Sequence, residues 1–220
     1  MGPLVELIIE NGTDVLTLAE CQSLDCQALI NSLYSFGQNW KLIEICARGD
    51  TKVLAKQSIC IMPHAEEKHY SVYKINSDTD LQLLIILHLP SAMHLEECAR
   101  NRIAENISRI LQKIEEELFA SKAFKSIIVG DFNLQPYSEG VAGVDGFNAT
   151  KSMTKALQNT RLVDGENKYF YFNPVWKLMG ENKLVQGTYY NSSDSQRKSI
   201  YWYSFDEVLI RPYFIKNPYQ

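Results

Sequence analysis

The pattern of apolar and polar positions predicts one long helix and several shorter ones. Between Arg100 and Phe119, apolar side chains recur every three or four residues and form the stripe of an amphipathic helix, namely Ile103, Ile107, Ile110, Ile114 and Leu118. A short helix is expected at Pro3–Glu10, because Pro is favoured in an opening turn and Asn11-Gly12 can end the helix. Further helices are expected at Leu24–Leu33 and Lys151–Gln158.

Short apolar runs bounded by turn residues predict β-strands. The run Leu83–Leu87 is apolar on both faces, which indicates a strand in the centre of a sheet. A turn at Gly49-Asp50 and a polar stretch at Asn76-Ser77-Asp78 each separate two neighbouring strands. The predicted strands are Asp14–Glu20, Trp40–Ala47, Lys52–Met62, Tyr70–Ile75, Leu81–Leu89, Lys125–Val129, Gly187–Asn191 and Ile200–Ile210.

The order of these elements indicates the fold class. Helices and strands are mixed, and several strands are close enough along the chain to form hairpins, so an α/β sandwich with mixed sheets is expected rather than a purely parallel sheet. The chain has no internal repeat and no low-complexity linker, so residues 1–220 are expected to form a single domain.

Composition supports a folded protein and says little about its partners. Hydrophobic residues make up 45% and charged residues 22% of the 220 residues, which excludes a disordered chain. The net charge of −4 gives no general attraction to nucleic acid, but a bound cation and a few local basic residues could still balance phosphate charge.

The five cysteines, Cys21, Cys26, Cys46, Cys60 and Cys98, are odd in number and include no CxxC pair. They indicate reduced thiols and a reducing compartment, so a cytoplasmic location is expected. No apolar run is long enough for a membrane span, and the N-terminus lacks the pattern of a secretory signal. The sequence does not indicate an oligomeric state.

The string Ile127–Asn133 is the most specific candidate for chemistry. A buried strand delivers Asp131 and Asn133 to its C-terminal end, and strand alternation points both to one side while Phe132 enters the core. A carboxylate and an amide would then lie together at a sheet edge. The alternative is an ordinary turn after a strand, where Asp and Asn are frequent.

Three further residues also stand at expected strand ends. Glu20 ends one strand, His88 follows the apolar run 81–87, and Asp206 begins the last strand. Each has a simpler explanation when taken alone. Glu20 and Asp206 could be solvated caps, and His88 could be a core histidine with its hydrogen bonds satisfied.

Taken together, DVLTLAE, LIILHLPS, IIVGDFN and SFDEVLIRP resemble, in this order, the endonuclease/exonuclease/phosphatase superfamily. The resemblance extends from Asp14 to Pro212, and GDFN is its most specific part. It implies a deoxyribonuclease I-like fold, a four-layer αββα sandwich of mixed sheets. It also implies a phosphodiesterase or phosphomonoesterase that uses Mg²⁺, with Mn²⁺ as an alternative.

The resemblance also assigns roles to individual residues. Glu20 matches the magnesium-binding glutamate, and Asp131 matches the aspartate that positions or deprotonates the attacking water. Asn133 matches the asparagine that hydrogen-bonds a phosphoryl oxygen. His88 matches a histidine that serves the phosphate or leaving group, and Asp206 resembles the aspartate that orients a later catalytic histidine.

The sequence departs from the family at both ends. No Asn-bearing strand precedes the first helix, and no Ser-Asp-His string follows Asp206, since the last of the four histidines is His94. The fold is therefore expected to be incomplete at both termini and turnover to be weak or absent. The alternative is an inactive homologue or a fragment that binds a phosphorylated ligand or a protein partner. DNA, RNA, lipid and inositol phosphate all remain open as substrates.

Three other features favour structural explanations. The string His64–His69 has its histidines five residues apart, so an exposed polar turn is expected rather than a zinc-binding helix. Packing is the preferred explanation for Tyr189, Tyr190, Trp202 and Tyr203, although such rings could stack on bases. Arg197 and Lys198 are expected at a solvated loop tip.

Overall fold

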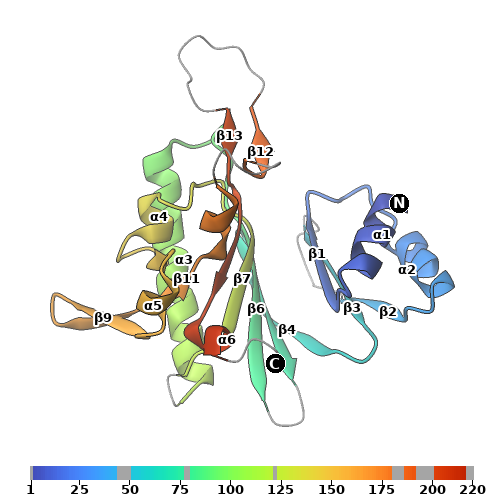
Figure 1. The fold of residues 1–220 in the computed structure, drawn as a ribbon, viewed down its shortest axis with the longest axis horizontal. Helices are drawn as coiled ribbons and strands as arrows, with labels where there is room; N and C mark the ends of the chain where they lie inside the picture. The colour runs from blue at the N-terminus through green and yellow to red at the C-terminus, as the bar shows by residue number, and fades with distance from the viewer. Residues whose placement is uncertain are drawn as a thin grey trace. The chain divides into compact units, whose positions relative to one another are not determined.

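The structure, a computed structural model, describes residues 2–43, 51–76, 80–120, 123–179, 186–191 and 201–216. The chain forms two compact units, Met1–Ile86 and Leu87–Gln220, which are coloured from blue to cyan and from green to red in Figure 1. Strand β6 (Leu81–His88) begins in the first unit and ends in the second. The single domain expected from the sequence stays a prediction.

In the first unit, two helices pack on a three-stranded antiparallel sheet. Helices α1 (Gly2–Glu10) and α2 (Cys26–Ser35) accompany strands in the order β1-β3-β2, with bounds Val15–Ala19, Thr51–Lys56 and Trp40–Ile43. Their shared core is apolar and includes Val5, Ile8, Leu29, Leu33, Trp40 and Leu54. Both predicted helices and the pairing of β2 with β3 are confirmed.

The rest of the first unit is an antiparallel hairpin next to β6. Strands β4 (Cys60–Glu67) and β5 (Tyr70–Asn76) pair, and the order is β4-β5-β6. The single strand predicted at Lys52–Met62 is wrong. It divides into β3 and β4 because a turn follows Lys56, whose carbonyl accepts a hydrogen bond from the Ile59 N–H. The exposed turn expected for His64–His69 is also partly wrong, since His64 lies in β4.

In the second unit, the end of β6 is followed across the sheet by β7, β14, β11 and β8. Strands β7 (Ser126–Asp131) and β14 (Asp206–Ile210) are antiparallel, whereas β11 (Tyr171–Phe172) and β8 (Ala149–Thr150) are parallel, so the sheet is mixed as expected. Helix α3 (Glu97–Leu118) lies along this sheet in Figure 1.

The second unit also contains short elements that the sequence only partly indicated. Helices α4 (Glu139–Ala142) and α5 (Met153–Ala156) lie in the chain between β7 and β9. The remaining elements are β9 (Thr160–Val163), β10 (Glu166–Tyr169), the 3-10 helix η1 (Pro174–Leu178), β12 (Tyr189–Tyr190), β13 (Trp202–Tyr203) and α6 (Pro212–Lys216).

The buried face of α3 differs from the predicted isoleucine stripe. Ile110 is 41% exposed, whereas Ala104, Ile107, Leu111 and Glu115 are buried. The prediction followed the large apolar side chains, whereas the buried face of α3 also includes the small Ala104 and the charged Glu115. Glu115 is tolerated there because it has a buried cationic partner, Arg211.

Within the part of the chain that the structure describes, no helix is long and apolar enough to cross a membrane. Some predictions lie outside the described residues, namely those for Cys46, for the turn at Gly49-Asp50, for Ser77 and Asp78, and for Arg197 and Lys198.

Candidate active site

Strand β7 carries Asp131 to its end beside the end of β6. The residue before it, Gly130, has a φ of +141°, and a Cβ there would lie 2.0 Å from the carbonyl oxygen of Leu87. Only glycine tolerates both this backbone conformation and this close approach. Gly130 therefore lets β7 run close to Leu87, next to His88, and fixes where Asp131 emerges.

A tight turn holds Asp131 and Asn133 together. The Asn133 backbone N–H donates to Asp131 Oδ1 at 2.7 Å, and its side-chain Nδ2 donates to Asp131 Oδ2 at 2.9 Å. Phe132, between them, is fully buried, as predicted. The expected juxtaposition is present, but its cause is different: the strand ends at Asp131 and Asn133 has a φ of +48°, so a turn rather than strand alternation brings the two side chains together.

Both hydrogens of the Asn133 amide are engaged within the protein. Besides Asp131, Nδ2 donates to the Leu89 carbonyl oxygen at 2.9 Å, and an amide nitrogen has only two hydrogens. Asn133 is 7% exposed. In this arrangement it positions the Asp131 carboxylate, and its contact with a phosphoryl oxygen, implied by the family resemblance, stays a prediction.

The segment after β6 also supports the turn. The Leu89 N–H donates to the Asp131 carbonyl oxygen at 3.0 Å, so Leu89 binds both Asp131 and Asn133. His88, half-buried, is the residue just before it and the last of β6. Buried Arg100, from α3, donates through Nη1 to the Asn133 carbonyl oxygen. Sequence reasoning missed Arg100, and its place in an amphipathic helix gave no signal for this role.

Asp206 stands opposite Asp131 in the sheet. The two residues are direct partners in the antiparallel pairing of β14 with β7, so their side chains lie on the same face. Asp206 is exposed. Its backbone N–H and that of Phe205 both donate to Thr188 Oγ1 at 3.0 Å, which fixes the start of β14. The structure thus brings together Asp131, Asn133 and Asp206, with His88 at the neighbouring strand end.

Glu20 lies in the first unit, immediately after β1. It is exposed and has a φ of +53°, so the chain turns there after the strand. The role of Glu20 as a metal ligand stays a prediction.

The described residues contain no group of three or more His, Cys, Asp or Glu that could hold a metal ion. Mg²⁺ does not require such a group, because it usually binds one or two carboxylates and keeps several waters. The carboxylate oxygens of Asp131 and Asp206, on one face of the sheet, fit this requirement.

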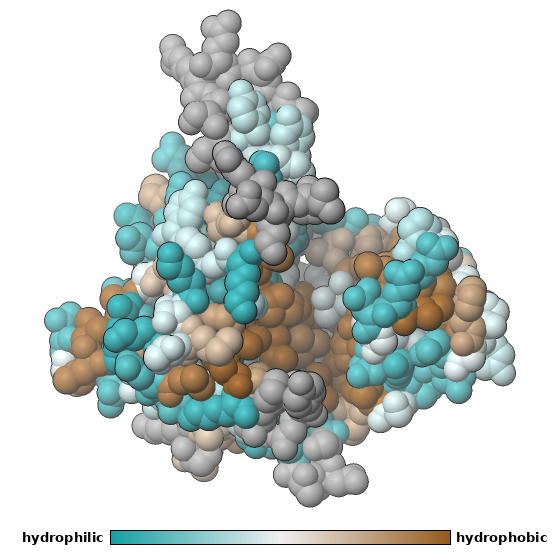
Figure 2. Space-filling view, viewed as in Figure 1, coloured by the Kyte–Doolittle hydropathy of each residue, from teal (hydrophilic) through white to brown (hydrophobic). Residues whose placement is uncertain are grey.

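An aromatic cluster precedes Asp206 in the chain. Its members, here called the aromatic hairpin, are Tyr189, Tyr190, Trp202, Tyr203 and Phe205. The Tyr189 and Phe205 rings stack with centroids 5.7 Å apart, and the Tyr190 and Trp202 rings are 5.0 Å apart. Tyr189 and Tyr190 are about half exposed, at 50% and 52%. Figure 2 shows the pale colours of near-neutral side chains over β12 and β13. Packing explains the ring contacts, yet much of this aromatic surface faces solvent.

A further carboxyl group near the site, that of Glu207, is buried. Glu207 is 2% exposed, and its Oε2 accepts a hydrogen bond from Asn173 Nδ2 at 2.5 Å. Burial raises the pKa of Glu207 well above the ordinary value, although the Asn173 hydrogen bond opposes this effect. Glu207 pairs with Gly130 in the sheet, so this buried carboxyl group belongs to the strand next to the one that carries Asp131.

No family model matches the sequence, and no curated protein is significantly similar to it. Solved structures are similar in fold. A truncated TDP2 from Caenorhabditis elegans has a TM-score of 0.54 at 15% identity, over 96% of this chain and 75% of that one. An endonuclease/exonuclease/phosphatase family protein from Bacteroides thetaiotaomicron has a TM-score of 0.51 at 12% identity, over 96% and 73%.

The chain has the fold of the endonuclease/exonuclease/phosphatase superfamily. A third structure of this fold, the endonuclease domain of TRAS1, a telomere-specific non-LTR retrotransposon, has a TM-score of 0.53 at 9% identity, over 98% of this chain and 80% of that domain. The deoxyribonuclease I-like fold implied by GDFN and the neighbouring strings is therefore confirmed. At these low sequence identities, the similarity to the solved structures shows the fold alone. The roles of the site residues stay predictions.

Proposed function

We propose that this chain is a phosphoesterase that uses Mg²⁺, or alternatively Mn²⁺, to hydrolyse phosphodiester bonds in nucleic acid. The observation that carries this proposal is the turn that clamps the Asp131 carboxylate against Asn133, directly opposite Asp206. The superfamily fold supports it, because similar structures include a domain named as an endonuclease.

The two facing carboxylates favour a divalent cation. Like charges directly opposite in a sheet repel each other, and a bound cation removes that repulsion. Asp131 and Asp206 would supply oxygen ligands, which Mg²⁺ and Mn²⁺ prefer, and Glu20 is the further candidate carried over from the sequence. When bound, the ion would neutralise charge on the phosphoryl oxygens.

Asp131 is the proposed general base. Two hydrogen bonds from Asn133 fix the orientation of its carboxylate, and each of its oxygens keeps lone pairs for a water molecule. A fixed carboxylate can hold the attacking water and accept its proton as the phosphorus–oxygen bond forms. His88, at the neighbouring strand end, is the candidate for contact with the phosphate or the leaving oxygen.

The aromatic hairpin supports a nucleic-acid substrate. Exposed Tyr189 and Tyr190 offer flat faces, and stacking on such faces contributes about 1–3 kcal/mol per base. Thr188 links the hairpin to the Asp206 backbone, so a base held there would place its phosphate near the carboxylates. Local contacts of this kind are needed because the net charge of −4 gives no general attraction.

Hydrolysis of a chromogenic phosphodiester and nicking of supercoiled plasmid, each with Mg²⁺ or Mn²⁺, would test the proposal. Asp131→Asn preserves size and removes the base, so we expect activity to fall by about 10²- to 10⁴-fold. Asp145→Asn is the matched control, since Asp145 is exposed in the loop after α4, and it should retain full activity.

The outcomes separate this proposal from its alternative. Metal-dependent activity that survives Asp131→Asn would contradict the role of Asp131. Activity at background in both the unchanged chain and the Asp145→Asn control would contradict the phosphoesterase proposal for this chain. That outcome would favour the alternative of an inactive homologue. It would also agree with the weak or absent turnover that the sequence predicts.

A further inference from the structure

A pocket of about 260 Å³ lies in the second unit, near α6. Four aromatic residues, Phe124, Tyr169, Phe170 and Tyr213, line it together with the basic residues Arg211 and Lys216. The other three lining residues are uncharged, so none of the nine is acidic. The lining therefore combines flat apolar surfaces with positive charge.

The aromatic walls are held in place by packing. The Phe124 and Tyr169 rings are 4.6 Å apart and inclined by 53°. Phe124 and Phe170 are buried, whereas Tyr213 is half-buried and can offer part of its ring to a ligand. A rigid wall loses little entropy when it binds, which favours a small, flat ligand.

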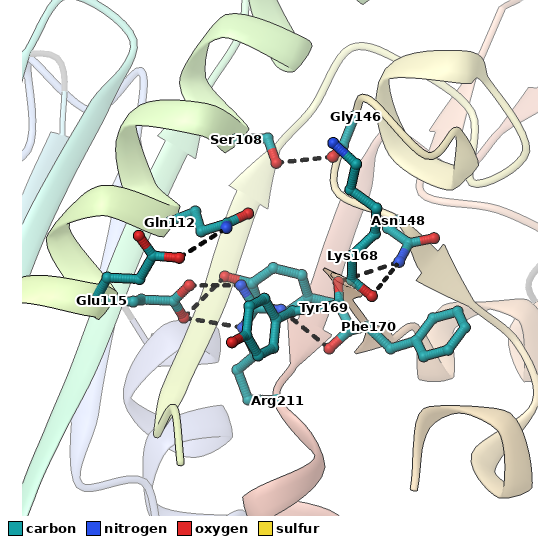
Figure 3. A network of polar contacts seen from close by, with 11 residues as sticks. Ser108, Gln112, Glu115, Gly146, Asn148, Lys168, Tyr169, Phe170 and Arg211 are labelled. Atoms are coloured by element: carbon teal, nitrogen blue, oxygen red, sulfur yellow. Dashed lines mark hydrogen bonds and ion pairs between the residues drawn. The ribbon is translucent and has the colours of Figure 1, made fainter. Parts of the chain in front are cut away.

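Arg211 forms part of the pocket wall, but its charge is already balanced. Its Nε and Nη2 donate to Glu115 at 2.9 and 2.5 Å, and Nη1 donates to the Phe170 carbonyl oxygen at 3.1 Å (Figure 3). Its guanidinium also lies 3.6 Å from the centroid of the Tyr171 ring. Arg211 thus acts as a fixed part of the scaffold, and the positive charge that a ligand can meet comes from Lys216.

Lys216 supplies that charge. Lys216 lines the pocket and is exposed, so its ammonium is available to a ligand. The ammonium of Lys125 lies 4.6 Å from the centroid of the Tyr213 ring, over the same wall residue. A cation beside aromatic faces suits a ligand that combines a flat ring with an anionic group.

The pocket is distinct from the candidate active site. Arg211 follows the last residue of β14, whereas Asp206 is the first, and Lys125 precedes β7, whereas Asp131 ends it. A strand rises by about 3.3 Å per residue, so the five steps from Asp206 to Arg211 span roughly 17 Å. A ligand in the pocket cannot be the group attacked at Asp131.

We propose that this pocket binds a small ligand made of a planar aromatic ring and an anionic group, of the class of a nucleoside monophosphate. The ring packs against Tyr213 and the other aromatic walls, and the anionic group pairs with Lys216. The volume of about 260 Å³ is just below the range of about 300–1,000 Å³ that is usual for ligand pockets, which favours a ligand no larger than a single nucleotide. This inference stands independently of the hydrolytic activity.

The test is a titration of the full chain, without divalent metal, with AMP, adenosine and inorganic phosphate in turn. Amide chemical shifts locate the binding. We expect AMP to shift residues 123–125, 169–170 and 211–216, and adenosine and phosphate to bind at least about tenfold more weakly, because each lacks half of the contacts. Lys216→Gln should weaken AMP binding about fivefold or more, at no cost to folding because Lys216 is exposed.

Matched controls and a second variant complete the experiment. Tyr213→Ala should also weaken AMP binding, while Lys68→Gln and Tyr34→Ala, exposed residues of the first unit, should leave it unchanged. Equal AMP affinity for Lys216→Gln and the unchanged chain would overturn the proposal. So would shifts confined to the residues around Asp131 and Asp206, or binding by phosphate as strong as that by AMP.

Discussion

Asp131 and Asp206 are direct cross-strand partners at the ends of β7 and β14. Two ionised carboxylates in this arrangement destabilise the sheet unless a cation lies between or beside them. Natural sheets usually place opposite charges or apolar groups in such pairs. Under the proposed function, a divalent ion bound at this strand end would relieve the repulsion between the two carboxylates.

We expect Mg²⁺ to raise the melting temperature of the unchanged chain. Asp206→Asn should raise the melting temperature in metal-free buffer and abolish that further rise with Mg²⁺. Removing one charge relieves a repulsion of about 0.5 kcal/mol, which high salt reduces. Thermal unfolding with EDTA and with millimolar Mg²⁺ measures both effects. The exposed-residue control Asp145→Asn should keep the Mg²⁺ response, and a response that persists in Asp206→Asn would exclude Asp206 as a ligand.

Asn133→Ala should destabilise the protein by about 2–4 kcal/mol. The change removes two side-chain hydrogen bonds, leaves the Leu89 carbonyl without that donor, and places Ala in a left-handed conformation. Asn133→Gly loses the same hydrogen bonds but tolerates the φ of +48°, so it should be about 1 kcal/mol less destabilising than Ala. Urea unfolding measures the loss of stability in each variant. Equal losses would show that the left-handed backbone conformation at residue 133 does not add to the cost of the Ala substitution.

The sequence predicted the strands that deliver the site because those strands carry strong local signals. The runs Leu83–Leu87 and Lys125–Val129 were both predicted as buried strands. Both are strands; Leu83–Leu87 is buried throughout, whereas β7 is buried only at Ser126 and Ile128. The meeting of Asp131 with Asn133 was also predicted, although for the wrong backbone reason. A positive φ at Asn133 depends on the turn that follows the strand, and periodicity does not report it.

The buried polar partners could not be predicted, because each depends on residues far apart in the chain. Nothing in the sequence predicted a buried Glu115, yet it is fully buried against Arg211, 96 residues later. Arg100 and Asn133 are 33 residues apart. Local patterns show that a residue is polar, whereas only the folded chain shows which polar residues satisfy one another.

Arg211→Met should destabilise the protein by about 3–5 kcal/mol, because it leaves the buried Glu115 carboxylate without its cation. The double variant Arg211→Met with Glu115→Met should recover much of that loss, since it buries no charge. Urea unfolding of the single and double variants gives the coupling between the two residues. Lys168→Met breaks the exposed pair with Glu166 and should cause no measurable change. A double variant as unstable as the single one would mean that shape, not charge, matters at this position.

Glu207 should make stability fall as the pH rises. Burial raises its pKa in the folded chain above the ordinary 4.5, so the folded state holds the proton more tightly than the unfolded state. The contribution of the protonated group is complete below pH 4.5 and is lost as the pH rises through the folded-state pKa. Within that window, the loss is about 1.4 kcal/mol per pH unit.

Glu207→Gln removes the titration while keeping the shape of the side chain and an acceptor for Asn173. Urea unfolding at a series of pH values upward from about pH 5 should therefore show a flatter dependence on pH in the variant than in the unchanged chain. Glu117→Gln, at an exposed position of α3, should keep the original slope. Identical slopes for Glu207→Gln and the unchanged chain would mean that Glu207 is not held protonated. If the stability of the unchanged chain still fell as the pH rose, another buried acidic group would have to be the cause.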